Sequence, residues 1–541
     1  MSAAWWRGAT IYQIYPRSFL DADGDGIGDL AGITQRLDHV ASLGADGVWI
    51  SPFFTSPMVD FGYDVADYRD IDPIFGTMAD FDTLIARAHD LGLKVMIDLV
   101  FAHTSDKHPW FAESRAGGAG TREDWALKDW YVWADARADG TPPNNWQSVF
   151  GGPAWTWDAR RGQYYMHQFL KEQPQLNVHN PEVQDALLDV VRFWLGKGVD
   201  GFRFDALNHA MHDPALRDNP VNPEPGPRTR PFDFQLRTQS QNHPALVGFI
   251  ERIRATIDAA GGACSIAEVG GANPMPLMRA YTAGDARLSS AYCFAFLDPG
   301  ALTPARVADA LAAWTGAPAT HGPDKGLPEG WPSWAFENHD VPRSLSRWAP
   351  EAHRAAYARM EMLLLGALRG TIFLYQGQEL GLAQDDIPFE ALRDPEAIAN
   401  WPQTLGRDGV RTPMPWTPSA AHAGFTTGTP WLPVSPGNAA RAVAAQEDDA
   451  DSLLHFTRRV IALRRAQPKL RTGDLRDVIA EGDLLRFRRI GADGTALFCA
   501  FNLGGETIAL GATGTILLAA NGATPATLPP YGALIAAETH A

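Results

Sequence analysis

The sequence predicts a (β/α)8 barrel, with a subdomain inserted after the third strand and a C-terminal antiparallel β-sandwich domain. Three observations indicate this fold class: eight short apolar, β-rich segments, the amphipathic stretches between them, and a strand-like alternation that begins near Lys469. The length of 541 residues exceeds the size at which one hydrophobic core stops growing, so smaller domains beside the barrel are expected.

The eight predicted strands are short apolar runs that end in polar residues. They lie at Ile11–Tyr15, Gly47–Ile50, Val95–Val100, Gly201–Asp205, Ser265–Glu268, Ala291–Phe296, Ser333–Glu337 and Thr371–Tyr375. Helical periodicity follows in Asp80–Leu91, Pro181–Gly196 and Arg354–Arg369. Eight strands that alternate with helices in this way favour a parallel barrel.

The domain limits follow from the segments that break this alternation. Residues 104–178 are irregular, rich in Trp, Gly and Pro, and too long for a simple connection, so we expect the inserted subdomain there. The barrel then comprises residues 1–103 and 179–468. Residues 469–541 carry strand-like alternation, as in Ala496–Leu503, and are predicted to form the C-terminal β domain.

Charge and composition restrict the partners. The formal net charge of −17 argues against a nucleic acid, because such affinity depends on Lys and Arg bound to phosphates. The three cysteines form neither a paired framework nor a metal-binding spacing. Neither a leader pattern nor a run of eighteen apolar residues is present. We therefore expect a cytoplasmic protein without a membrane segment that acts on a small neutral substrate, and its oligomeric state stays open.

The polar residues that close the strands point to one shared site. In barrels of this kind, function gathers at the carboxyl ends of the strands. Four of the predicted strands end in or run into Asp98 and His103, Arg203 and Asp205, Glu268, and Asn338–Asp340. A lone aspartate is more often a cap or an ion-pair partner, but four strands that end this way indicate a common function.

Paired carboxylates with a third nearby are what the cleavage of a glycosidic bond needs. Arg203 lies two residues before Asp205 and therefore points to the same side of the strand. Its cation would keep Asp205 ionised and nucleophilic at neutral pH. Partial burial of Glu268 after Ser265–Ala267 would raise its pKa, so that this side chain holds a proton to donate.

Nine motifs stand in the same order as in a known family. They are GVWISP at Gly47–Pro52, GYD at Gly62–Asp64, DLVFAHTS at Asp98–Ser105, QPQLN at Gln173–Asn177, GFRFDALNH at Gly201–His209, AEV at Ala267–Val269, ENHD at Glu337–Asp340, YQGQE at Tyr375–Glu379 and GRDGVRTPMPW at Gly406–Trp416. Over nearly its whole length the chain resembles glycoside hydrolase family 13, the α-amylase family, and within it the α-glucosidase and oligo-1,6-glucosidase group.

The resemblance implies a role for each of four strand-end residues. Asp205 would be the nucleophile and Glu268 the general acid/base of a retaining reaction. Asp340 would be the third carboxylate, which binds the 2- and 3-hydroxyls of the sugar. Arg203 would orient the nucleophile.

The same resemblance implies the residues that bind the terminal glucose. His103 and His339 would bind its hydroxyls, and Tyr63 would stack on its ring. Asp64 and Arg407 would hold its far edge and close the pocket, which makes the enzyme exo-acting on short α-glucosides.

For two residues of the expected pocket, the sequence leaves two interpretations open. Phe150, in the inserted subdomain, either lines the pocket or belongs to a core. Ala206 follows the nucleophile, where the resembled group has Val with α-1,6 preference and smaller or polar residues with α-1,4 preference. We therefore expect α-1,4 substrates such as maltose, or sucrose-like α-glucosides, unless Ala206 merely packs.

The first loop has the pattern of a metal site. Carboxylates and one backbone oxygen alternate with glycines at Asp21, Asp23, Asp25, Ile27 and Asp29, a spacing that suits Ca²⁺ or Mg²⁺. The loop lacks the closing Glu of an EF-hand, but the resembled glucosidases bind a cation here. The alternative is an Asp/Gly turn without metal. No organic cofactor is expected.

Three functions are compatible with a site of this kind. The first is a hydrolytic α-glucosidase, and the second is a transglucosylase or sucrose isomerase that uses the same glucosyl-enzyme intermediate. The sequence does not decide between these two, and hydrolysis is taken as the default. The third is a catalytically silent binding subunit. It is disfavoured because Asp205, Glu268 and Asp340 are all present.

Overall fold

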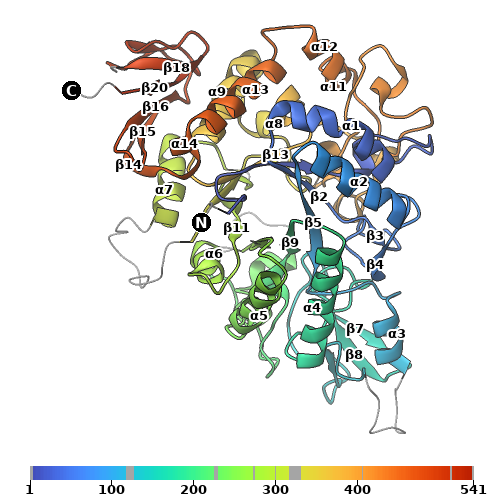
Figure 1. The fold of residues 1–541 in the computed structure, drawn as a ribbon. Helices are drawn as coiled ribbons and strands as arrows, with labels where there is room; N and C mark the ends of the chain where they lie inside the picture. Colours follow the sequence, from blue (N-terminus) through green and yellow to red (C-terminus); the bar gives the residue numbers. More distant parts are fainter. Residues whose placement is uncertain are drawn as a thin grey trace.

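The computed structural model describes residues 4–116, 127–224, 230–271, 274–298, 300–315, 330–404, 406–511 and 514–538. Its centre is a parallel sheet of eight strands in the order β11–β10–β9–β5–β2–β1–β13–β12. The sheet curls into a nearly closed barrel with helices around it (Figure 1). The predicted barrel class is therefore confirmed.

All eight predicted barrel strands are present. Their bounds are Thr10–Ile14 (β1), Gly47–Ile50 (β2), Lys94–Val100 (β5), Gly201–Asp205 (β9), Cys264–Glu268 (β10), Ser290–Tyr292 (β11), Ser333–Ala335 (β12) and Thr371–Tyr375 (β13). The sixth is shorter than predicted, because Phe294–Phe296 forms a 3-10 helix instead. Side chains join the two end strands of the sheet, since Ser333 Oγ donates to the Ala291 carbonyl at 2.5 Å.

The helices begin and end at recognisable signals. Their bounds are Leu30–Leu43 (α1), Met78–Asp90 (α2), Pro109–Ala116 (α3), Pro181–Gly196 (α4), Leu246–Ala259 (α5), Met275–Thr282 (α6), Pro304–Thr315 (α7), Ser344–Trp348 (α8), Arg354–Ala367 (α9), Pro395–Asn400 (α10), Pro436–Ala439 (α11), Val443–Glu447 (α12), Leu453–Ala466 (α13) and Pro468–Thr472 (α14). Helix α2 starts with a reciprocal capping box between Thr77 and Asp80. Helix α4 starts at Pro181, and Asn180 before it is the N-cap. Among the described residues, none of these helices is long and apolar enough to cross a membrane.

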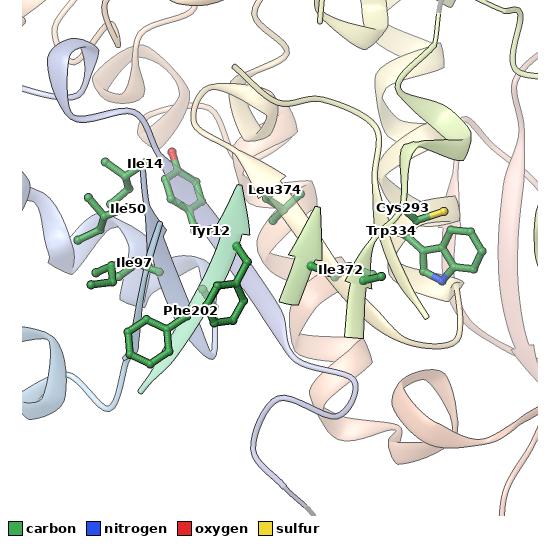
Figure 2. Packing of buried hydrophobic residues seen from close by; sticks show 14 of the residues in the cluster. Tyr12, Ile14, Ile50, Ile97, Phe202, Cys293, Trp334, Ile372 and Leu374 are labelled. Atoms are coloured by element: carbon green, nitrogen blue, oxygen red, sulfur yellow. The ribbon is translucent and has the colours of Figure 1, made fainter. Parts of the chain in front are cut away.

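Alternation along the strands separates two apolar layers. One set of side chains fills the barrel interior and includes Ile11, Trp49, Met96, Ile266 and Phe373. Their neighbours along each strand face outward onto the helices, and Tyr12, Ile50, Ile97, Phe202 and Leu374 belong to this outer layer (Figure 2). Because the side-chain period of a strand is two, the polar residues that continue the inner set converge at the barrel mouth.

The remaining strands form small antiparallel sheets. Within residues 104–178, a three-stranded sheet is formed by Trp133–Ala134 (β6), Gln163–Met166 (β8) and Trp155–Asp158 (β7). Earlier in the chain, Phe54–Thr55 (β3) pairs with Asp67–Ile71 (β4). The C-terminal sheet contains Asp474–Glu481 (β14), Leu484–Ile490 (β15), Ala496–Asn502 (β16), Ala533–Ala537 (β20) and Thr515–Ala520 (β18). Ile508–Ala509 (β17) and Thr527–Leu528 (β19) form a pair that packs on it through a separate apolar cluster. The exact domain limits stay predictions.

Two buried arginines support the region where the C-terminal sheet meets the barrel, and of the two Arg489 joins the sheet itself to α9. Arg464 on α13 donates to the carbonyls of Gly366 and Leu368 at the end of α9, at 2.9 and 2.8 Å. Arg489 on β15 donates to the Ala367 carbonyl at 2.6 Å. Figure 1 shows the sheet lying beside α9 and α7. Both guanidinium groups bind backbone oxygens, so their role is structural.

Candidate active site

A pocket of about 420 Å³ opens at the carboxyl ends of the barrel strands. Seven of the ten sequence-predicted catalytic and substrate-binding residues line it: Asp205, Glu268, Asp340, Tyr63, His103, Arg407 and Phe150. The other three, Asp64, Arg203 and His339, are not among its lining residues. The loops after several different strands therefore meet at one cavity, as expected for this fold.

Arg203 is the centre of a carboxylate cluster beneath the pocket. Its Nη1 lies 2.7 Å from both Asp205 Oδ1 and Asp98 Oδ1, and its Nη2 lies 2.8 Å from Glu268 Oε2. The barrel register places Asp98 directly beside Arg203 on the neighbouring strand. The prediction that Arg203 and Asp205 point to the same side is confirmed, whereas Asp98 is an additional partner of Arg203.

The turn after β9 orients the acid/base candidate. Ala206 has a left-handed backbone conformation with φ of 39°, which is uncommon for a residue with a side chain. Its N–H donates to Glu268 Oε2 at 2.7 Å. The residue that follows Asp205 thus connects the two candidate catalytic carboxylates through the backbone.

Burial raises the pKa values of both candidate catalytic carboxylates. It raises the pKa of Asp205 to about 7 and that of Glu268 to about 8, although Arg203 opposes both shifts. The predicted rise for Glu268 is confirmed. The expectation that Arg203 holds Asp205 ionised at neutral pH is wrong in degree, because three carboxylates, including Asp98, share this one cation. Between the two values Asp205 is mostly ionised while Glu268 mostly keeps its proton.

Asp340 has the opposite electrostatic environment. Burial alone would raise its pKa, but contacts with His339, Arg411 and Arg407 hold the pKa well below its usual range. Arg411 Nη2 lies 2.8 Å from Asp340 Oδ1, and His339 Nε2 lies 3.3 Å from Oδ2. Asp340 is therefore a permanent anion at the pocket wall.

His339 supports Tyr63 from behind the pocket surface. The two rings stack at 5.5 Å with an interplanar angle of 2°, and His339 Nε2 lies 2.6 Å from Tyr63 Oη. On the other side, Gln13 Nε2 lies 2.7 Å from His339 Nδ1. Burial lowers the pKa of His339 to about 3, so its ring is neutral. His339 is fully buried and contacts Tyr63 and Asp340, and its implied contact with the sugar hydroxyls stays a prediction.

Arg407 and two aspartates form an ion cluster at one edge of the pocket. Arg407 Nη2 lies 2.9 Å from Asp394 Oδ1 and 3.0 Å from Asp60 Oδ1. The sequence-based choice of Asp64 is wrong here, because its two oxygens accept the backbone N–H groups of Val59 and Asp60. Left-handed backbone at residues 61 and 62 turns Asp64 away from the cavity, and Asp60 lines the cavity instead.

His103 and Phe150 form another part of the wall. His103 Nε2 lies 3.1 Å from the Tyr63 carbonyl, and burial lowers the pKa of His103 to about 4. Phe150 contacts Phe169 at a ring distance of 5.9 Å and lies 5.3 Å from the Arg407 guanidinium. Of the two alternatives for Phe150, the pocket wall is the one observed. Phe169 was not predicted, since no pattern distinguishes it from a core residue.

The first loop gathers three of the five predicted metal ligands. Oxygens of Asp21, Asp23 and Asp29 all lie within 4.8 Å of one another, whereas Asp25 is outside this group. Such a set of hard carboxylate oxygens fits Ca²⁺ or Mg²⁺. Asp21 also accepts hydrogen bonds from the N–H groups of residues 24 and 26, both at 2.7 Å. Internal hydrogen bonds therefore also stabilise the turn. The expected ligation of the ion by the Ile27 carbonyl stays a prediction.

Fold and site together define a class of protein. A parallel barrel with two buried carboxylates on one guanidinium group, and a third, ionised carboxylate at its mouth, is the arrangement that a glycoside hydrolase needs. A family model for the α-amylase catalytic domain matches residues 13–473, and one for a domain of unknown function (DUF3459) matches residues 473–535.

Relatives and solved structures agree with this class. The chain is 51% identical over 510 residues to a probable α-glucosidase of Rhizobium meliloti (strain 1021), covering 93% of this chain and 90% of that protein. It is 37% identical over 518 residues to an oligo-1,6-glucosidase of Parageobacillus thermoglucosidasius, covering 90% and 88%. The structure of the α-glucosyl transfer enzyme XgtA matches with a TM-score of 0.92 and 46% identity, over 99% of this chain and 100% of that one. The chain therefore belongs to the α-amylase family, glycoside hydrolase family 13, and is an α-glucosidase-type enzyme.

Proposed function

We propose that this enzyme is a retaining, exo-acting α-glucosidase that removes terminal glucose from short α-glucosides through a covalent glucosyl-enzyme intermediate. The observation that carries the proposal is the position of Asp205 and Glu268 on the two terminal nitrogens of one guanidinium group, at 2.7 and 2.8 Å. Retaining glycosidases need their two carboxyl groups only about 5–5.5 Å apart, so that no water fits between nucleophile and sugar. Two carboxylates on one guanidinium are compatible with that spacing.

In the proposed reaction, Asp205 attacks the anomeric carbon while Glu268 donates its proton to the departing glycosidic oxygen. The pKa order supports this division, because the group with pKa of about 7 ionises before the group with pKa of about 8. After glycosylation Glu268 is a carboxylate and accepts a proton from water, which then releases glucose. Asp340 binds the 2- and 3-hydroxyls as an anion.

The exo assignment rests on the far edge of the pocket. Arg407 is held there by Asp60 and Asp394, and Phe150 lies over its guanidinium. A ring that enters as far as Asp205 then meets this ion cluster, which leaves no path for a further sugar unit. Only a chain end fits such a pocket, with Tyr63 and His103 along its wall.

For linkage we propose a preference for α-1,4 bonds. The support is Ala206, which lines the pocket next to Asp205 and leaves more space than a β-branched residue would. An α-1,6 preference is the alternative, which the 37% identity to an oligo-1,6-glucosidase favours. Transglucosylation is a second candidate activity, favoured by the 46% identity and TM-score of 0.92 to an α-glucosyl transfer enzyme. In that reaction a sugar hydroxyl replaces water as the acceptor.

We also propose that the first loop binds Ca²⁺ or Mg²⁺. Asp21, Asp23 and Asp29 would hold the ion, with the Ile27 carbonyl as a further donor. When bound, the ion would offset most of the negative charge of the three carboxylates and stabilise the loop that leads into α1. Its role is structural, and no catalytic step passes through it.

The decisive experiment follows the anomeric form of the released sugar. Proton NMR of the hydrolysis of an aryl α-glucoside, which releases one glucose per turnover, should show α-glucose first if the reaction retains configuration, whereas initial β-glucose would refute the mechanism. Product analysis on maltose, isomaltose, sucrose and starch, in one set of conditions, would decide linkage and acceptor preference. Release of internal fragments from starch would contradict the exo assignment.

Variants test the two catalytic roles separately. Asp205→Asn should lower kcat by several orders of magnitude while sugar binding persists. Glu268→Gln should slow maltose far more than an activated aryl glucoside, because only the poor leaving group needs the proton. Arg464→Gln is a matched control, since that buried arginine contacts no carboxylate of the site. Equal losses on both substrates would count against Glu268 as acid.

A further inference from the structure

A second cavity, of about 530 Å³, lies at the other end of the barrel from the active site. Its wall is made by residues that precede barrel strands: Trp6 before β1, Ser289 before β11, Trp331 before β12 and Arg369 before β13. Figure 1 shows the chain start beside β11 and α6, which agrees with these lining residues. The cavity therefore shares no residue with the catalytic pocket.

The charge of this cavity is opposite to that of the chain. The chain has a formal net charge of −17, yet four arginines and two aspartates are found among the residues that line the cavity. The arginines are Arg7, Arg254, Arg287 and Arg369. A concave site with an excess of one sign of charge concentrates ligands of the other sign, so this cavity favours an anion.

Two of the arginines are already engaged by acidic partners. Arg254 Nε donates to Asp258 Oδ2 at 2.9 Å, and Arg287 Nε lies 3.5 Å from Glu251 Oε1. Arg7 differs, because the structure gives its guanidinium no carboxylate partner within the residues described. Its charge is accordingly available to a ligand, while the engaged pairs form the rigid wall around it.

Tryptophan faces hold the guanidinium groups in place. The Arg7 guanidinium lies 5.0 Å from the Trp6 ring and 5.1 Å from the Trp331 ring, and that of Arg369 lies 5.2 Å from Trp331. Trp331 is itself fixed, since its Nε1 donates to Thr371 Oγ1 at 3.1 Å. Cation–π contacts of this kind orient the donors before a ligand arrives, which lowers the entropic cost of binding.

From this geometry we infer that the cavity binds a small organic phosphate monoester, with Arg7 and Arg369 as its phosphate ligands. Guanidinium donors match phosphate oxygens in a forked geometry, which makes arginine the common choice for such recognition. The volume falls within the range of small-molecule sites and leaves space for an organic group beside the phosphate. The indole rings of Trp6 and Trp331 lie next to that space.

Binding there would connect the chain start to the loops before β11, β12 and β13. A ligand that binds the folded state alone raises stability by mass action, so the inference predicts a ligand-dependent melting temperature. The catalytic residues do not line this cavity. Hydrolysis of a chromogenic α-glucoside should therefore continue in variants that lose the site.

The test uses the full-length enzyme and calorimetric titration at constant ionic strength. The probes are glycerol 3-phosphate, inorganic phosphate and, as the uncharged comparison, glycerol. Glycerol 3-phosphate at about 5 mM should bind and raise Tm by a few degrees, as expected when the ligand concentration far exceeds Kd. Stronger binding of glycerol 3-phosphate than of inorganic phosphate would support an organic ligand, and equal binding would reassign the site to free phosphate and overturn that part.

Two variants and one control locate the site. Arg7→Gln should weaken binding of glycerol 3-phosphate by about tenfold or more, the usual loss for one charge-assisted contact, and Arg7→Gln with Arg369→Gln should abolish it. Arg476→Gln is the control, because Arg476 is 66% exposed on the C-terminal sheet and, among the residues that the structure describes, forms an ion pair only with Asp474. If Arg369→Gln impairs folding, the binding of glycerol 3-phosphate to Arg7→Gln alone tests the inference. Absence of binding, or equal binding by Arg7→Gln and the parent enzyme, would overturn the inference.

Discussion

Replacing Arg203 by glutamine should move the whole pH–activity profile to higher pH. The active form needs Asp205 ionised and Glu268 protonated, so activity rises through the lower pKa and falls through the higher one. Both carboxylates contact the Arg203 guanidinium, at 2.7 and 2.8 Å. Removal of the cation disfavours both anions, which raises both pKa values and shifts both limbs in the same direction.

The size of the shift follows from the distances. Charges about 4 Å apart interact by about 4 kcal/mol at an effective dielectric constant of 20, and about 1.4 kcal/mol equals one pKa unit. Because Asp98 shares the same cation, we expect a shift of about 1–3 units for each group. From a pKa of about 7 for Asp205, a one-unit rise lowers its ionised fraction at pH 7 from about one half to about one tenth. Activity at pH 7 should fall at least about fivefold, and part of it should return at higher pH.

The assay is kcat/KM for an aryl α-glucoside measured from pH 5 to pH 10, which extends about one unit beyond the upper limb after a one-unit shift. After a larger shift, activity should still be rising at the upper end of this range. Arg203→Lys keeps a charge but not the fork that serves three carboxylates, so its profile should shift less. Arg464→Gln is the control for loss of a buried arginine, and its limbs should stay in place. Circular dichroism and thermal unfolding verify that each variant is folded.

Unmoved limbs in a folded Arg203→Gln enzyme would refute this reasoning. They would mean that burial alone sets the two pKa values and that the guanidinium serves only to align Asp205. A shift of one limb without the other would instead contradict the placement of both carboxylates on the same cation.

Three further outcomes are expected. The parent enzyme should show a narrow bell-shaped kcat/KM profile with limbs near pH 7 and pH 8, the pKa values of Asp205 and Glu268; a plateau down to pH 5 would contradict the raised pKa of Asp205. Asp60→Asn should raise KM for maltose by about tenfold through the freed Arg407, whereas Asp64→Asn should mainly lower Tm, and the reverse pattern would disprove the corrected assignment. Chelation by EDTA should lower Tm by a few degrees and should have no effect on Asp23→Asn; equal Tm with and without EDTA in the parent enzyme would argue against the cation.

Local pattern was sufficient for the barrel and for most of the site. Alternation along β9 places Arg203 and Asp205 on one face whatever surrounds the strand, because the side-chain period of a strand is two. The same rule brings Glu268 into the cluster from β10. Order along the chain then identified Asp340 and Arg407 through motifs that resemble the family.

The local sequence pattern does not predict contacts that depend on how the loops fold. Asp60 and Asp64 lie four residues apart, and the left-handed backbone between them, at residues 61 and 62, decides which carboxylate reaches the pocket. Asp394 meets Arg407 only because a long loop folds back over the barrel mouth. No periodicity encodes either choice.

The sequence by itself determined the eight strands, the residue types at their ends and the family to which the chain belongs. Only the tertiary structure decided how acidic those residues are and which of them line the pocket. The physical reason is that a pKa depends on burial and on every nearby charge: Arg203 divides its cation among three carboxylates, and no stretch of sequence contains all four groups.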